Sequence, residues 1–409
     1  MTVPDARPDV NAWRVGLVLT LLPMVLGLER WAYWMSRGAL FMHLRGLGVA
    51  SESIRSIMTG QVVANTLLVL LGGLVAVAAG PVVPLAAGVA ISVVGYALIA
   101  ASDGSPMVWV GMGVLALGQG LCKPAFFAVA ASELGHPREQ LRTLSFVLLY
   151  AVLNASALTS STAAGVVTTR MGAAAVFATA AGAAALGALL AAGLGIAWFL
   201  TRERKAPAPS PLSTGRVLWG ALGLVALAAP YVALLTLVSS LSFDASSRSS
   251  LSWLTLVNPL LVILGSCLVM GVLAVLHLRR LELPALLVVA VGLCLAAVAA
   301  VPLMLARTSL WAAFTAEGTL GLAEVLVGPF AMARLVGDVP RRFQTLVMSG
   351  WFVVSGGVPV AVSSLSRAFP QAEIFGLAAV AVAVFVIGVA LMLTAKALSR
   401  WLYEPPPPP

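Results

Sequence analysis

Long apolar stretches fill most of the chain, and short polar or Pro/Gly breaks separate them. Twelve stretches reach the roughly 20 residues that a helix needs to cross the hydrocarbon core of a bilayer. They lie at 12–34, 53–79, 81–102, 106–131, 141–168, 172–200, 216–241, 251–276, 283–305, 309–335, 343–368 and 374–398. The pattern predicts an all-α integral membrane protein with twelve transmembrane helices.

Composition supports this prediction. Hydrophobic residues make up 60% of the chain and charged residues only 10%, whereas soluble domains are about 25% charged. The run "GAAAVFATAAGAAALGALLAAGLG" at 172–195 is typical of helices that pack closely in lipid. Simple apolar filler explains such a run equally well.

One basic, Pro-rich break, "TRERKAPAPSPLSTGR", divides the spans six and six. Its composition favours an extended, solvated linker. We therefore expect an N-terminal six-helix bundle at 1–200, a cytoplasmic linker at 201–215 and a C-terminal six-helix bundle at 216–401. A proline-rich tail follows at 402–409.

The distribution of Lys and Arg predicts the orientation. With the N-terminus inside, the inner segments hold fifteen of these residues and the outer segments hold seven. Since cationic loops stay on the cytoplasmic side, we expect both termini there and a multi-pass protein of the cell membrane. The first residues show no signal-peptide pattern, so no cleavage is expected.

Several function classes lack support in the sequence. The net charge of +9 is scattered through short loops, which argues against nucleic acid as a partner. Cys122, Cys267 and Cys294 lie in apolar spans without metal-ligand spacing, so neither a disulfide framework nor a metal site is indicated. No phosphate-binding loop or hydrolase motif is present. We expect no cofactor and no enzymatic activity.

Five ionisable residues interrupt the apolar spans, and each costs several kcal/mol at the bilayer centre. They are Glu29, Arg30, Lys123, Glu317 and Glu324. They need partners or a wet cavity, and their charges sum to −1. This set predicts a charged cavity between the two halves, although buried ion pairs that merely lock helices together are the alternative.

The spacing of these residues refines the expectation. Adjacent helical residues point about 100° apart, so we expect Glu29 and Arg30 to find separate partners, with Lys123 or a proton serving Glu29. Pro124, next to Lys123, can kink its helix and open space around a site. Glu317 and Glu324 are seven apart and share one helix face. Glu317 lies near the outer end of its span. We therefore expect it to contact water or to lock helices together, in preference to a role in binding.

Six short stretches, in order, resemble the proton-dependent oligopeptide transporters of the major facilitator superfamily. In the first half these are "LERWAYW", "LGQGLCKPAFFA" and "FVLLYAVLNASAL". In the second half they are "LVNPLLVIL", "LGLAEVLVGPFAMA" and "MSGWFVVSGG". The resemblance implies the twelve-helix fold of that superfamily, in two bundles that alternate access to a central site.

Some positions depart from the family pattern. Leu26 stands where the first-helix motif has its first glutamate, which weakens the expectation of proton coupling. The seventh-helix stretch "YVALLTLVSSLSF" lacks the expected glutamate and glutamine, and the charged loop between helices two and three is reduced to "AAGPVVP". The chain is thus a divergent relative by this comparison.

The resemblance implies roles for individual residues. Arg30, Tyr33 and Lys123 would face a substrate carboxylate, and Asn258 and Glu324 would hold an α-amino group. Asn154 would form a hydrogen bond with the backbone of the substrate peptide, and Trp351 would line a pocket for one of its side chains. Glu29, with Arg30 and Lys123, would carry proton coupling. Packing explains Tyr33 and Trp351 at least as well, and interhelical hydrogen bonds explain Asn154 and Asn258 equally well.

Small peptides or other zwitterions, protons and the lipid bilayer are therefore the expected partners. Two other functions stay open. One is a facilitator-fold exporter of amphipathic or cationic compounds, with Glu317 and Glu324 as its site. The other is a non-transporting scaffold subunit whose polyproline tail, Pro405 to Pro409, binds an aromatic groove of a partner.

Overall fold

The structure is a computed structural model that describes residues 12–134, 139–200, 214–248, 256–279, 281, 283–306, 308–337 and 339–403. All regular structure in these ranges is helical. The first-half helices are α1 (Ala12–Gly46), α2 (Ser51–Ala79), α3 (Val82–Ala100), α4 (Ser105–Glu133), α5 (Glu139–Met171) and α6 (Ala173–Leu200). The second half contains α7 (Thr214–Arg248), α8 (Val257–Leu278), α9 (Ala285–Ala299), α10 (Val301–Leu305), α11 (Leu310–Gly337), α12 (Arg341–Ala368) and α13 (Glu373–Tyr403), with a 3-10 turn at Pro370–Ala372.

The prediction of twelve spans is confirmed: the described residues contain twelve stretches long and apolar enough to cross a membrane. Two of the differences from the predicted extents are described here. α1 continues to Gly46 rather than ending at residue 34. The ninth span divides into α9 and α10 at Ala300, two residues before Pro302, whose ring nitrogen has no hydrogen to donate to the preceding turn.

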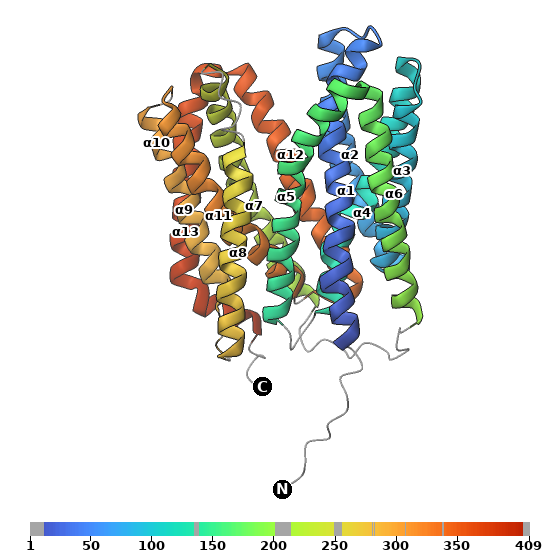
Figure 1. Ribbon diagram of the computed structural model, residues 1–409. Helices are drawn as coiled ribbons and strands as arrows, with labels where there is room; N and C mark the ends of the chain where they lie inside the picture. The colour runs from blue at the N-terminus through green and yellow to red at the C-terminus, as the bar shows by residue number, and fades with distance from the viewer. Residues whose placement is uncertain are drawn as a thin grey trace.

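The helices stand side by side and traverse the molecule in alternating directions (Figure 1). α3 packs on α4 and α6, α1 packs on α5 and α6, and α9 packs on α11 and α13. Contacts between the first and second halves join α2 to α12 and α5 to α8 and α11. Most of the predicted linker, 201–213, and most of the tail, 404–409, lie outside the described residues, so the domain borders stay a prediction.

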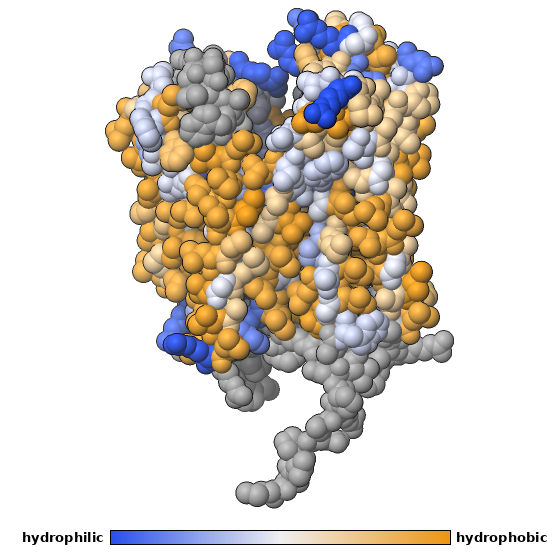
Figure 2. Space-filling model, viewed as in Figure 1, coloured by the Kyte–Doolittle hydropathy of each residue, from blue (hydrophilic) through white to orange (hydrophobic). Residues whose placement is uncertain are grey.

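The outer surface suits a lipid environment. On the face shown in Figure 2, a broad apolar band lies between two more hydrophilic ends. Leu189, Leu268 and Leu393 are among the exposed apolar side chains of the described residues. α1 begins and α13 ends at one end, called here the terminal end (Figure 1). At the opposite end, Figure 2 shows a hollow between the two halves.

Small residues allow α3 and α4 to approach closely. A Cβ atom built on Gly118 lies 2.5 Å from the Ser92 hydroxyl oxygen and 2.7 Å from the Gly88 carbonyl oxygen. A Cβ atom on Gly88 in turn lies 2.5 Å from the Gly118 carbonyl oxygen. No side chain fits between these backbones, which is the packing expected of small residues in membrane helices.

We expect Gly118→Val to destabilise the protein by about 1–3 kcal/mol, because the new side chain must push α3 and α4 apart. Gly113→Val is the matched control, since Gly113 lies on the same helix and a Cβ atom there meets nothing within 4 Å. Thermal unfolding of the purified variants in detergent measures the difference. Equal melting temperatures for the two variants would contradict this account of the α3–α4 contact.

Candidate functional site

Glu29 and Arg30 form a buried ion pair with each other. The Arg30 Nη2 atom donates to Glu29 Oε1 at 2.6 Å, and its Nε atom donates to Oε2. Glu29 is fully buried and Arg30 is 6% exposed. The expectation of separate partners is therefore wrong. The long Arg30 stem bends back along the helix, and attraction in the low-dielectric interior outweighs the divergent directions of the two Cβ atoms.

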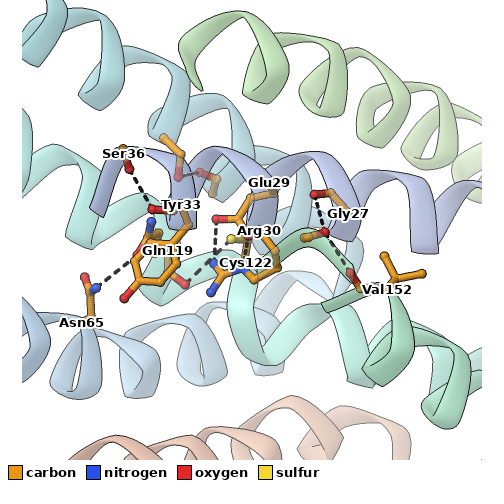
Figure 3. A network of polar contacts seen from close by, with 12 residues as sticks. Gly27, Glu29, Arg30, Tyr33, Ser36, Asn65, Gln119, Cys122 and Val152 are labelled. Atoms are coloured by element: carbon orange, nitrogen blue, oxygen red, sulfur yellow. Dashed lines mark hydrogen bonds and ion pairs between the residues drawn. The ribbon is translucent and has the colours of Figure 1, made fainter. Parts of the chain in front are cut away.

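Polar side chains from α2 and α4 lie close to this pair (Figure 3). Asn65 donates to Gln119 Oε1 at 3.1 Å, and the Gln119 amide contacts the Tyr96 hydroxyl at 3.3 Å. Gln119 and Tyr96 are both buried. Gln119 lies one helical turn before Lys123, so an amide within an apolar span was the sequence signal that could have identified this network.

Tyr33 lies between two guanidinium groups on one face of α1. Its ring centroid is 4.9 Å from Arg30 Cζ and 5.9 Å from Arg37 Cζ. Arg37 Nη1 also donates to the Tyr33 hydroxyl at 2.6 Å. Arg37 was not predicted as a site residue, because the predicted span ended before it. Its spacing of seven residues from Arg30 was the available signal.

Lys123 contacts the second half rather than Glu29. α4 continues through Pro124 to Glu133, and the Lys123 Nζ atom lies 4.7 Å from the Phe352 ring centroid on α12. Among the described residues no carboxylate forms an ion pair with Lys123, whereas Glu29 pairs with Arg30. The expected Glu29–Lys123 pair is thus absent from this structure.

Glu324 joins the two halves through Tyr150. The Tyr150 hydroxyl on α5 donates to Glu324 Oε1 on α11 at 2.5 Å. The helices are close here, since a Cβ atom on Gly328 would lie 3.1 Å from the Tyr150 ring. Glu324 therefore has a neutral partner in this conformation.

Glu317 lies two turns before Glu324 on α11 and is 7% exposed. Ser239 and Ser242 of α7 and Asn258 of α8 lie beside its carboxylate. Asn258 also lies beside Glu324. Glu317 is thus buried beside polar side chains of α7 and α8, and the expectation of a wetted or locking residue stays a prediction.

Asn154 and Trp351 contact other protein groups. The Asn154 amide donates to the Tyr150 carbonyl oxygen on its own helix at 2.9 Å, which is not the interhelical bond considered from the sequence. Trp351 is 7% exposed and belongs to the hydrophobic core, in agreement with the packing interpretation. Substrate roles for both stay predictions.

The two halves meet closely from the middle of the molecule to the terminal end. Gln140 of α5 contacts His277 Nδ1 at 2.9 Å and donates to the Leu281 carbonyl oxygen. Ser349 of α12 donates to the Val69 carbonyl oxygen of α2 at 2.8 Å. Together with the hollow at the opposite end (Figure 2), these contacts describe a conformation closed at the terminal end.

Solved structures of peptide transporters resemble this arrangement. A peptide transporter POT in complex with sulfate gives a TM-score of 0.64 at 18% identity, covering 94% of this chain and 95% of that chain. A POT family transporter in complex with a thioalcohol conjugated peptide gives 0.66 at 14% identity, covering 93% and 96%. Another, with 5-aminolevulinic acid, gives 0.61 at 15% identity, also covering 93% and 96%.

No protein-family model matches the chain, and no curated protein sequence does. The likeness in three dimensions establishes the fold. It is the fold of POT transporters, and the expectation of a major facilitator superfamily fold is confirmed. The function of this chain is argued from its own site.

Proposed function

We propose that this chain is a secondary active transporter of di- and tripeptides or related zwitterionic solutes. The observation that carries the proposal is the division of charge between the halves. Glu29 neutralises Arg30, so Lys123 and Arg37 remain as positive charges of the first half, and Lys123 contacts Phe352 of the second half. The second half presents the carboxylates of Glu317 and Glu324.

A zwitterion fits this division. Its carboxylate would bind among Arg30, Tyr33 and Lys123, and its amino group would replace the Tyr150 hydroxyl at Glu324. Opposite charges at the two ends fix the direction of the ligand without requiring contacts to its side chains. Asn154, Asn258 and Trp351 would line the space between the two ends.

Alternating access follows from the same contacts. The Tyr150–Glu324 bond and the Gln140–His277 contact lie on the closed side, so the opposite conformation must break them. With cytoplasmic termini, the hollow in Figure 2 faces outward. The structure would then be the state that receives solute from outside the cell.

The proposal also includes proton coupling through Glu29. A substrate carboxylate that takes the Arg30 guanidinium leaves Glu29 buried without its cation. A buried carboxylate without a cation binds a proton more readily. Substrate and proton binding would thereby become linked, even though Leu26 removes the second acid of the motif.

The experiment is counterflow of labelled Ala–Ala in liposomes that contain the purified chain, preceded by a thermal-shift screen of di- and tripeptides. We expect saturable exchange of dipeptides and little exchange of lipophilic cations. An inward proton gradient should drive modest accumulation. Exchange of lipophilic cations alone would favour the exporter interpretation, which the two acidic residues of α11 also suit.

Orientation is the first prediction from this proposal. Reporters fused after residue 202 or residue 400 should read cytoplasmic, because the inner segments carry most of the Lys and Arg. A reporter near Arg45, at the opposite end of α1, should read outside. An outside reading at residue 202 would contradict the arrangement of six spans on each side of the linker.

The second prediction concerns recognition of the amino group of the substrate. Glu324→Gln should weaken the binding of zwitterionic dipeptides by about 1.5–3 kcal/mol, the range for a hydrogen bond to a charged group. Isothermal calorimetry with Ala–Ala and N-acetyl-Ala–Ala measures the effect and supplies the control. An equal loss for both ligands, or no loss, would refute the role of Glu324.

A further inference from the structure

Among the described residues of the second half, no cation pairs with the carboxylates of Glu317 and Glu324. Glu317 and Glu324 share one face of α11, about 10 Å apart along the axis at about 1.5 Å per residue. The groups beside Glu317 are the neutral side chains of Ser239, Ser242 and Asn258. Within the described ranges neither acid forms an ion pair, whereas Glu29 in the first half has both oxygens occupied by Arg30.

A buried hydroxyl group without a hydrogen-bond partner lies near Glu324. Tyr231 of α7 is 3% exposed, and its hydroxyl has no hydrogen-bond partner in the part of the chain that is described. It lies near Glu324 and Tyr150. The hydroxyl of Ser242, which lies beside Glu317 and is 3% exposed, likewise has no hydrogen-bond partner among the described residues. Buried polar atoms are normally satisfied, so an unsatisfied hydroxyl near each acid indicates a place where a ligand completes the interactions.

The position of Glu317 suits a second cationic group of the same ligand. α11 runs from the end with the hollow toward the terminal end (Figure 1), and Glu317 precedes the Tyr150–Glu324 bond along this direction. Two extended residues span about 7 Å, and the flexible four-carbon stem of lysine extends this reach. A dipeptide with its amino terminus at Glu324 therefore brings a lysine ammonium within range of Glu317.

We propose that Glu317 is a subsite for a basic side chain, so that the transporter favours peptides that carry a second ammonium group. This inference rests on the proposed function, in which Glu324 holds the amino terminus. The neutral side chains beside Glu317 bring no positive charge to its carboxylate, and the ammonium of the ligand supplies that charge.

Competition with labelled Ala–Ala uptake in liposomes tests the subsite. In the wild type, Ala–Lys should compete at least about tenfold better than Ala–(Nε-acetyl-Lys), which has the same stem without the charge. In Glu317→Gln this ratio should fall to about one. Glu52→Gln is the control for general attraction of cations, because Glu52 is an exposed acid at the end with the hollow and should leave the ratio unchanged.

One further variant and two contrary outcomes make the test decisive. If Glu317→Gln fails to fold, Glu317→Asp keeps the charge on a shorter stem and should retain part of the preference. Equal competition by the two lysyl peptides in the wild type, or a preference that survives in Glu317→Gln, overturns the subsite while Ala–Ala uptake upholds the transporter. Absence of any peptide uptake by the folded wild type contradicts the proposed function itself.

Discussion

Replacing either member of the Glu29–Arg30 pair is expected to lower the free energy of unfolding by about 3–5 kcal/mol. Glu29→Leu leaves the Arg30 guanidinium buried without its carboxylate, and Arg30→Met leaves the fully buried Glu29 carboxylate without a cation. An unpaired charge in this position cannot recover the water that burial removed. Thermal or denaturant unfolding in detergent, without substrate, measures the loss.

The double variant separates the cost of an unpaired charge from the value of the pair. Glu29→Leu combined with Arg30→Met buries no charge, so it should recover most of the stability that each single variant loses. Glu52→Leu removes an exposed acid and should change stability by less than about 0.5 kcal/mol. Losses that simply add in the double variant would show that the two side chains stabilise the fold independently.

The number and approximate position of the spans could be predicted because every span carries its own apolar signal. The end of α1 could not be predicted in this way. Its last turns contain polar side chains that suggest a loop, but the structure gives them partners within the protein. His43, for example, is 8% exposed and contacts the Ser102 hydroxyl at 3.0 Å. Hydropathy records the residue type and contains no information about such a partner.

The charged residues of the candidate site could be predicted from the sequence, but the partners that they contact could not. Charged residues inside apolar spans identified Glu29, Arg30 and Glu324, since such residues are rare and costly in a bilayer. Which groups meet depends on side-chain conformation and on how the helices cross. Tyr150 and Glu324 are 174 residues apart, so their contact exists only through the packing of α5 on α11.

The Tyr150–Glu324 bond leads to the second large prediction. Tyr150→Phe removes a hydroxyl that donates to a carboxylate across the two halves, and such bonds contribute about 1.5–3 kcal/mol. Because the bond exists on the closed side, its loss should raise the population open at the terminal end by about tenfold or more. Tyr231→Phe is the matched control, since the buried Tyr231 hydroxyl has no hydrogen-bond partner in the described residues.

Distance measurements between spin labels report this population. Leu200 and Leu278 are each 81% exposed and end α6 and α8 at the terminal end. In a background without native cysteines, labels at these positions should show a larger long-distance fraction in Tyr150→Phe than in the wild type or Tyr231→Phe. An equal increase in both variants would show that general loosening, and not this bond, governs the opening.

A bound peptide should act on the same equilibrium. If its amino group replaces the Tyr150 hydroxyl at Glu324, a saturating dipeptide lengthens the Leu200–Leu278 distance in the wild type by breaking the bond that Tyr150→Phe already lacks. The peptide should therefore produce a much smaller further change in Tyr150→Phe, because a ligand shifts an equilibrium only through contacts that differ between the two states. A peptide-induced shift of equal size in both proteins would mean that the substrate opens the terminal end through another contact, and Lys123 against Phe352 would be the next to test.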